Sequence, residues 1–376
     1  MSWPVVALIA LAACGTQAPA PAPMAEAPAP PSSPEDALDA WFDTWSEPLP
    51  VAPEGPPLPA SLATVVFASC LQPSKPAPIL GPMAEVGADL AVFLGDNVYG
   101  DALAGDVTLP ELRQAYTALA GMEAFGAFAA STPIVATWDD HDYGMNDAGA
   151  SFTPRRFAER IFETFWRLPE GDPRRSRPGV YHAQAFGAEG QRVQVVLLDT
   201  RWSKGPWTPA TERGPGKERY VPTQGGGVPM LGEDQWRWLG EVLQEPADVR
   251  LIVSSLQVHA EGHGWERWGL LPEERDRLYA ALAARAESAV VLISGDRHRA
   301  GIYERPDLPG GPYPEMTTSS LNLSFGGDEE AGPHRLGPTF TGENFGVLTF
   351  DWEAGTARLS VRDAAGEEVL GHDVEL

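Results

Sequence analysis

Cysteine and lysine are scarce in this chain of 376 residues, and basic residues are few relative to acidic ones. The two cysteines are Cys14 and Cys70, and we expect no structural disulfide between them, because a different role is predicted for each below. Acidic residues outnumber basic ones, and the net charge is −25. Such a charge repels the phosphates of nucleic acid, so we expect no nucleic-acid partner. Small phosphorylated substrates stay possible, because bound cations reverse the charge of a site locally.

The apolar stretch at the N-terminus is short. Residues 1–13 cannot span a bilayer, and they end in small residues, as a secretory signal does. The sequence around Cys14 resembles the lipobox of bacterial lipoproteins, although no Lys or Arg precedes it. We predict a lipoprotein signal peptide at 1–13, lipidation of Cys14, membrane association through this anchor, and a periplasmic or cell-surface location in the cell envelope. An ordinary cleaved signal and a misassigned start codon are the alternatives.

Residues 14–60 are predicted to be a Pro- and Ala-rich tether that contains one short amphipathic helix. The helix begins near Ser33-Pro34, a typical start signal. Its apolar residues at helical spacing are Leu38, Trp41, Phe42 and Trp45. Residues 61–376 then alternate strand and helix patterns, which predicts a single catalytic domain of the α/β class. After Phe345, three short alternating runs predict an antiparallel meander.

Six apolar runs of strand length each end in residues that bind metals or phosphates. The residues at these ends are Cys70; Asp96 and Tyr99; Asp139 to Asp142; Asp199 and Arg201; Gln257 and His259; and Asp296 and His298. Open α/β sheets bind ligands at the carboxyl ends of their strands. We therefore expect these side chains to converge on one polar site.

The motifs resemble those of one enzyme family. No Gly-x-Ser-x-Gly elbow occurs, which argues against a Ser-His-Asp hydrolase. The ordered motifs instead resemble the calcineurin-like metallophosphoesterases, and more narrowly the PhoD-type alkaline phosphatases and phosphodiesterases. They are Ser69-Cys70, GDNVY (95–99), WDDHD (138–142), LDTR (198–201), LGEDQWRWL (231–239) and SGDRH (294–298). The resemblance implies a two-sheet α/β/β/α sandwich of the metallophosphoesterase type. It also implies hydrolysis of phosphoric monoesters or diesters by a metal-activated hydroxide at a multinuclear site.

The chemistry of phosphoester hydrolysis explains these residue types. Two neighbouring cations acidify a water molecule and neutralise the phosphoryl oxygens, and a carboxylate that bridges them holds both. Asp96 is the candidate bridge. Cys70 and Tyr99 beside it favour a trivalent, thiophilic ion, and iron(III) fits best. By the resemblance, Asp140 is a ligand, His141 donates a proton to the leaving oxygen, and Asp142 orients the His141 ring. Whether His141 is an acid or a ligand stays open.

Asp296 and His298 are two residues apart. In an extended segment both side chains point the same way, so we expect them to bind one ion. The carboxylate of Asp296, with an added oxygen from Asn146, favours calcium or manganese over zinc. The expected cofactors are therefore iron(III) and calcium, with manganese or zinc as alternatives to calcium.

Three further residues are expected to bind substrate. Asp199, Arg201 and Gln257 follow two of the strand ends. Arg201 clamps a phosphoryl oxygen in this hypothesis; a salt bridge to Asp199 is the alternative. His259 is equally well explained as a structural histidine, and we expect His263, His334 and His372 at the surface. The irregular stretch 203–232 either covers the site or is a surface insertion.

Two other functions remain open at this point. Two-metal sites of Asp and His also serve esterases and lactonases that do not act on phosphate. A catalytically inactive, metal-binding surface lipoprotein is the other alternative. For the favoured function, the partner is a small phosphorylated substrate or a phospholipid head group.

Overall fold

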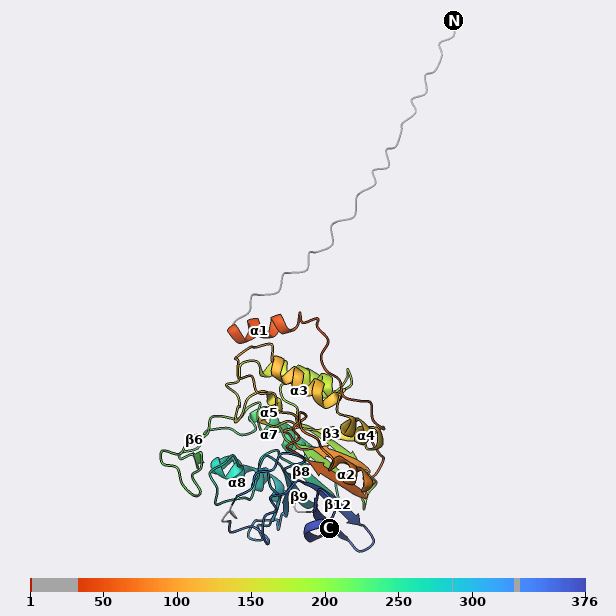
Figure 1. Ribbon diagram of the computed structural model, residues 1–376, viewed down its shortest axis with the longest axis vertical. Helices are drawn as coiled ribbons and strands as arrows, with labels where there is room; N and C mark the ends of the chain where they lie inside the picture. Colours follow the sequence, from red (N-terminus) through yellow and green to blue (C-terminus); the bar gives the residue numbers. More distant parts are fainter. Residues whose placement is uncertain (2–32, 286, 328–331) are drawn as a thin grey trace.

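The six apolar runs form strands of two mixed sheets in the computed structural model, which describes residues 1, 33–285, 287–327 and 332–376 (Figure 1). Three of them are parallel neighbours in the first sheet and three in the second. The first three are β1 (Thr64–Ala68), β2 (Leu90–Phe93) and β3 (Ile134–Ala136). The second three are β5 (Val193–Leu197), β8 (Val249–Val253) and β9 (Ala289–Ser294).

Further strands complete each sheet, and most of them run antiparallel to their neighbours. The first sheet has the order β14-β13-β12-β1-β2-β3, and the predicted meander supplies its outer half: β12 (Asn344–Asp351), β13 (Thr356–Asp363) and β14 (Glu368–Glu375). The second has the order β10-β11-β9-β8-β5-β4, with β4 (His182–Phe186), β10 (Gly301–Tyr303) and β11 (Glu315–Thr317). Strands of three to eight residues are usual in globular domains.

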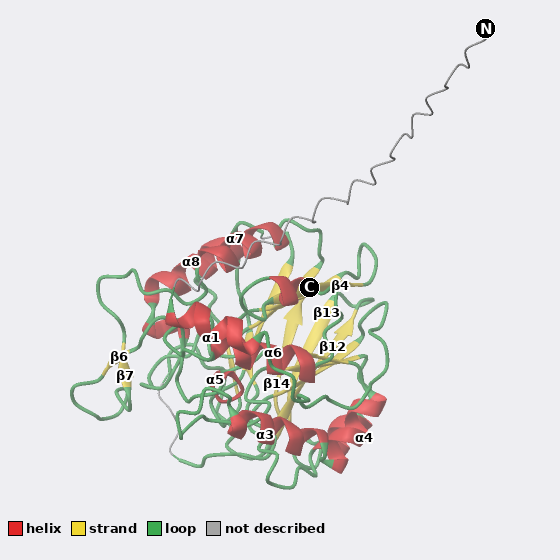
Figure 2. Cartoon of the chain, turned by 90° about the horizontal axis from the view of Figure 1, so that it is seen from above, coloured by secondary structure: helices red, strands yellow, loops and turns green. Residues whose placement is uncertain are grey.

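Three apolar layers hold the sandwich together, because alternate residues of each strand face opposite sides. Val65 and Phe67 of β1 pack with Leu251 of β8 between the sheets. Val66 of β1 faces outward into a layer of helices, and Ile252 of β8 faces outward into another. Helices α3 and α4 cover the first sheet, and α7 and α8 lie on the other side of the strands (Figure 2). The predicted two-sheet α/β/β/α sandwich is therefore confirmed.

Eight α-helices occur in the described part of the chain, and one segment with a continuous helical pattern is divided into two of them. They are α1 (Pro34–Phe42), α2 (Leu80–Glu85), α3 (Pro110–Ala120), α4 (Glu123–Ser131), α5 (Asp140–Tyr143), α6 (Arg155–Phe165), α7 (Glu233–Val242) and α8 (Pro272–Ala283). The segment 109–128 is helical in pattern throughout, but the structure ends α3 before Gly121 and starts α4 at Glu123. Gly121 accounts for the break, since glycine is a poor helix former.

The predicted amphipathic helix is α1, and it packs on the domain. Ser33 caps it by accepting a hydrogen bond from the N–H of Asp36. The ring of Phe42 stacks on Phe157 of α6 at 4.3 Å, and Glu35 pairs with Arg155 at 2.7 Å. The predicted signal peptide and Cys14 lie outside the described residues. Within the described part of the chain, none of the helices has the length and apolar character needed to cross a membrane.

Candidate metal centre

The predicted site residues meet where the strands of both sheets end, and several of them have a strained backbone. Cys70, Asp96, Asp296 and His298 all adopt positive φ angles, of 57°, 51°, 64° and 53°. Side chains other than glycine disfavour this left-handed region, and such strain is concentrated at functional sites. The left-handed turns direct these side chains toward one another instead of along the strands.

One group of ligand atoms contains Cys70, Asp96 and His298, all within 4.8 Å of one another. The Cys70 Sγ lies 3.6 Å from Asp96 Oδ2. Tyr99 Oη donates to the same carboxylate oxygen at 3.1 Å and lies 3.4 Å from His298 Nε2. A thiol, a phenol, an imidazole and a carboxylate therefore face one point. Cys70, Asp96 and Tyr99 are brought together as predicted, and His298 joins them.

The protonation states of this group suit metal binding. The His298 Nδ1–H donates to the carbonyl oxygen of Leu323 at 2.5 Å, which directs Nε2 toward Tyr99 Oη. Burial opposes ionisation of the Cys70 thiol, but the charge of His298 and hydrogen bonds from His298 and Ser319 outweigh it and lower the pKa of Cys70 to about 6. A thiolate is the form of cysteine that binds metals.

A second group consists of four carboxylates, those of Asp96, Asp139, Asp140 and Asp296, within 4.8 Å of one another. Burial, followed by the negative charges of Cys70, Asp140 and Asp139, raises the pKa of Asp96 well above its usual range. Burial and the neighbouring acids do the same to the pKa of Asp296. Asp96 belongs to both groups, as the predicted bridge must.

The expected pairing of Asp296 with His298 on one ion is not what the structure shows. Asp296 lies with the carboxylate group, and His298 lies with Cys70. The expectation assumed an extended segment, but both residues have positive φ angles, so the alternation of side chains along a strand does not apply. Asn146 is exposed, and its N–H donates to Asp101 Oδ1 at 2.6 Å.

The carboxylate that holds His141 is Asp101 rather than Asp142. His141 Nδ1 lies 2.7 Å from Asp101 Oδ2. Burial lowers the pKa of His141, but the charge of Asp140 and the hydrogen bond and charge of Asp101 raise it to about 9. The buried Asp142 instead accepts the N–H groups of Asp96 and Asn97, each at 3.2 Å, and of Asp139 at 2.5 Å. The prediction that Asp142 orients His141 is therefore wrong, because Asp142 ties the ends of β2 and β3 together.

Arg201 is a buried structural residue whose guanidinium binds other side chains, so it is not placed to bind a phosphoryl oxygen. Its side chain is fully buried, and its guanidinium donates to both oxygens of Glu266 at 2.8 and 2.9 Å and to Asp139 at 2.5 Å. The alternative interpretation, a salt bridge between the side chains of Arg201 and Asp199, is also not found. The Arg201 contact with Asp199 is made by its backbone N–H. Arg201 therefore fixes Asp139 and balances part of the buried negative charge.

Asp199 and Gln257, expected to bind substrate, also have structural partners. The Asp199 carboxylate accepts backbone N–H groups of Val180 and Trp202. Gln257 donates to Tyr303 and Thr317 and accepts from His263 Nε2 at 3.0 Å; these are short contacts within the core.

The two histidines near Gln257 are structural. His259 contacts Tyr279 Oη and the carbonyl oxygen of Tyr313, which confirms its structural interpretation. His263 is buried, so the prediction of a surface position was wrong for it. His263 lies in an irregular segment, where Gln257 accepts from its Nε2 and its Nδ1 accepts the N–H of Trp265, and a residue without a surrounding motif did not reveal this burial.

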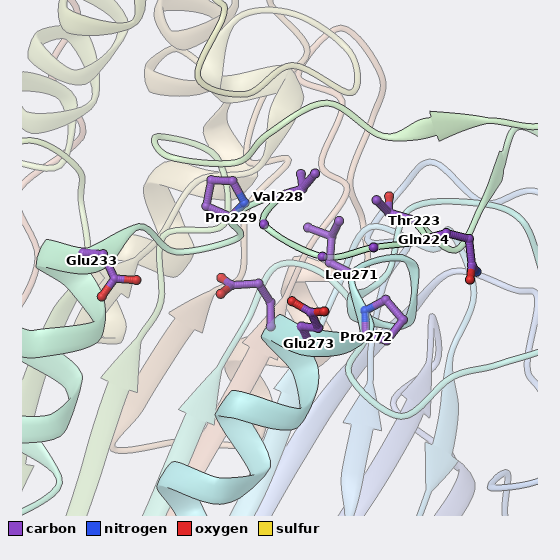
Figure 3. A pocket seen from close by; sticks show the side chains of 12 residues that line it. Thr223, Gln224, Val228, Pro229, Glu233, Leu271, Pro272 and Glu273 are labelled. Carbon is purple, nitrogen blue, oxygen red and sulfur yellow. The ribbon is translucent and has the colours of Figure 1, made fainter.

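The irregular stretch 203–232 contacts the edge of the centre. Strand β7 (Tyr220–Val221) pairs with β6 (Thr208–Pro209), and Arg219 beside it lies 2.7 Å from Asp147 Oδ2. Asp147 in turn donates its N–H to Asp140 Oδ2 at 2.5 Å. Further along, residues 223–229 line a cavity of about 350 Å³ with the start of α8 (Figure 3). The predicted site residues do not line this cavity.

The residues present fit bound cations. Three buried carboxylate oxygens, one each on Asp96, Asp139 and Asp140, have no hydrogen-bond partner among the described residues. Buried oxygens without partners cost free energy, and like charges this close repel. Cations between them would remove both costs. The set of thiolate, phenolate, imidazole and carboxylate suits a hard yet thiophilic ion at one position and an oxygen-binding ion at the other.

The comparisons with known proteins agree with this geometry. The family model of the PhoD-like phosphatases matches residues 65–345. The chain belongs to this family. Among solved structures, a structure of PhoD matches this PhoD-like chain with a TM-score of 0.64 and 18% identity, over 87% of this chain and 70% of that one. A search of curated proteins finds no match.

Membership of the PhoD-like phosphatases decides the general class of reaction. It confirms the predicted PhoD-type identity, and the likeness to PhoD confirms the fold. Together with the acid and histidine groups, it supports metal-dependent hydrolysis of phosphoric esters at this centre.

The sequence did not indicate two residues that complete the centre, Asp101 and Glu266. Asp139 was expected at the site with its motif 138–142, but without a role of its own in the carboxylate group. Asp101 lies two residues after the motif 95–99, and a search for a carboxylate within reach of His141 could have included it. Glu266 lies in an irregular segment far from any motif, and no local signal marks it.

Proposed function

We propose that this protein hydrolyses phosphoric monoesters or diesters, with Asp96 bridging an iron(III) ion and a calcium ion. The observation that carries the proposal is the position of Asp96, whose carboxylate is shared by the group of Cys70 and His298 and by the group of four carboxylates. Cys70, Tyr99 and His298 would hold the iron. Asp139, Asp140 and Asp296 would hold calcium, with manganese or zinc as alternatives. When bound, these cations acidify a water molecule and neutralise the phosphoryl charge.

The chain's own residues supply the remaining steps. His141 is held by Asp101 through Nδ1, and its side chain is 16% exposed, so its other nitrogen can meet a substrate. We assign it as the proton donor to the leaving oxygen, because Asp101 orients the ring and leaves its other nitrogen available to carry a proton to the substrate. Arg201 and Asp142 are positioning residues that keep Asp139 and the β2 and β3 ends in place.

The test combines metal analysis with turnover. The purified protein is analysed for iron and calcium, and its rates on an aryl phosphate and a bis-aryl phosphate are measured. Asp96→Asn should lose metal and turnover together, because an amide cannot bridge two cations. Asp276→Asn, which changes an exposed carboxylate on α8, is the control and should keep both. Full metal content with a normal rate in Asp96→Asn would rule the assignment out.

The proposal extends to the location of the enzyme. The lipobox-like sequence at Cys14 supports a lipid anchor in the cell envelope, with the Pro-rich tether between membrane and domain. Several acyl chains contribute ~0.8 kcal/mol for each buried CH₂ group, far more than reversible binding needs. The full-length protein should therefore sediment with membranes, and Cys14→Ser should be soluble. A wild-type protein found wholly in the soluble fraction would contradict the anchor.

A further inference from the structure

An exposed aromatic ring stands directly on the candidate ligand His298. Phe325 keeps 55% of its surface exposed, and its ring centroid lies 4.2 Å from that of His298 with 37° between the planes. Its backbone N–H also donates to the carbonyl oxygen of His298 at 3.2 Å. A lone exposed apolar side chain is ordinary. This one is held by both its ring face and its backbone against the centre where a substrate must bind.

The segment that carries Phe325 is fixed to the metal centre at several points. Ser319 Oγ lies 3.0 Å from Cys70 Sγ and accepts the N–H of His298 at 2.8 Å. The side chain of Asn322 accepts the N–H of Gln72 at 2.7 Å and donates to the Gln72 carbonyl oxygen at 3.0 Å. The ring is thus presented by an ordered segment. A ligand that stacks on it loses little free energy to ordering of the protein.

The ring also begins a row of aromatic side chains that runs into the centre. The His298 ring is followed by Tyr99 at 6.2 Å and then by His141 at 4.3 Å from Tyr99. Asp96 lies within 4.8 Å of ligand atoms of both His298 and His141, so a phosphoryl group held at this carboxylate would lie close to both histidines of the row. Phe325, which contacts His298, is the exposed end of the row, so an ester group that extends from the centre past His298 would meet its ring.

We propose that Phe325 selects phosphoric esters with an aromatic ester group by stacking on that group at the rim of the metal centre. The inference rests on the proposed function and adds a specificity residue to it. Stacked aromatic rings attract one another by more than the free energy of the apolar area that they bury. This extra attraction corresponds to binding of an aromatic ester about threefold to tenfold tighter than that of a non-aromatic ester.

The experiment separates ring recognition from leaving-group acidity. Phenyl esters, monoester and diester, are compared with esters of a fluorinated alcohol that is about as acidic as phenol. Phe325→Ala should lower kcat/KM for the phenyl esters by about threefold to tenfold, mainly through KM, and leave the fluoroalkyl esters unchanged. Calorimetry with phenylphosphonate and methylphosphonate gives a readout without turnover, and only the phenylphosphonate Kd should rise.

Matched variants complete the test. Phe325→Trp should keep the preference, and Phe325→Leu, which is apolar but has no ring, should lose it. Trp352→Ala removes a partly buried ring near the start of β1, at the opposite end of that strand from Cys70, and should change neither substrate. Equal losses on both ester series, or loss of metal from Phe325→Ala, would show that the ring only shields His298. A wild-type protein that turns over neither series would overturn the proposed function and this inference with it.

Discussion

At the scale of single residues, the proposed proton transfer to the leaving group depends on His141, and Asp101 orients its ring. The Nδ1 contact of 2.7 Å fixes the ring and leaves Nε2 to act. A general acid contributes ~10²–10⁴-fold to a rate, and it contributes most when the leaving group is a poor one. Because Asp101 positions the His141 ring, the Asp101 carboxylate should affect how well the enzyme hydrolyses esters with poor leaving groups.

We predict that His141→Ala lowers hydrolysis of alkyl phosphates by ~10²-fold or more and that of acidic aryl phosphates much less, since an acidic phenol leaves without a proton. Asp101→Asn should give a milder form of the same pattern. Rates on both ester classes and metal content by elemental analysis are the measurements. If His141→Ala instead loses a metal and fails equally on both classes, then His141 is a ligand.

Turns at strand ends bring the site together at the scale of elements, and glycine makes one of them possible. Gly95 has a φ of +107°, and a Cβ placed on it would lie 2.6 Å from both the backbone nitrogen and the Cβ of Asp139. The end of β2 therefore touches the end of β3 backbone to backbone. This contact sets the separation of Asp96 from Asp139 and Asp140.

Gly95→Ala should destabilise the fold by about 2 kcal/mol or more and reduce metal content, because backbone atoms at this distance must move apart. Gly87→Ala is the control, since Gly87 also has a positive φ of 65° but has nothing within 4 Å of the added carbon. It should cost only the backbone strain, about 1 kcal/mol. Urea unfolding of both variants measures the difference, and similar losses in the two would argue against the close approach.

Helix α6 carries a buried carboxyl whose titration should be visible in stability. Glu159 contacts Arg156 and the N–H of Gly179, and its side chain is 2% exposed. Burial, only partly offset by Arg156, raises the pKa of Glu159 from 4.5 to about 8. The folded state therefore holds this proton more tightly than the unfolded chain does. The stabilisation is complete below about pH 4.5 and is lost as the pH rises to about 8.

Glu159→Gln should remove this part of the pH dependence. The free energy of unfolding of the wild type should fall relative to the variant by up to about 1.4 kcal/mol per pH unit within that range. Urea unfolding at several pH values measures the difference between the two proteins, in which titrations at the metal centre cancel. Glu241→Gln, an exposed change on α7, should follow the wild type. A constant difference between wild type and Glu159→Gln would refute the shift.

Comparison of the sequence with the structure shows which features local patterns encode. The strand ends at Cys70, Asp96 and Asp140 could be found because apolar runs mark the strands and parallel strands end at one edge. The partners of His141 and Arg201 could not, since Asp101 and Glu266 lie in irregular segments whose path depends on packing. The left-handed backbone at Asp296 and His298 escaped prediction for a related reason. Neither residue is a glycine, so the residue type did not indicate a left-handed turn.

At the scale of the whole molecule, the chain carries a net charge of −25 and gathers four carboxylates in one buried place. Self-repulsion of this kind destabilises a folded state unless cations offset it. Binding of cations to the folded state alone adds RT ln(1 + [L]/Kd) to its stability, about 2.7 kcal/mol at 100 times Kd. The fold and the metals should therefore be coupled.

This coupling predicts a reversal of stability between wild type and Asp96→Asn. Without metal, the variant should be the more stable, because burial and the neighbouring acids raise the pKa of Asp96 well above its usual range and an amide carries no charge to be buried. With iron and calcium present, the wild type should be the more stable, because it alone keeps the bridging carboxylate. Thermal unfolding in chelator and in metal-loaded buffer measures both orders. If Asp96→Asn is less stable in both buffers, the Asp96 carboxylate supports the fold through its contacts with Tyr99 and Cys70 and does not bridge two ions.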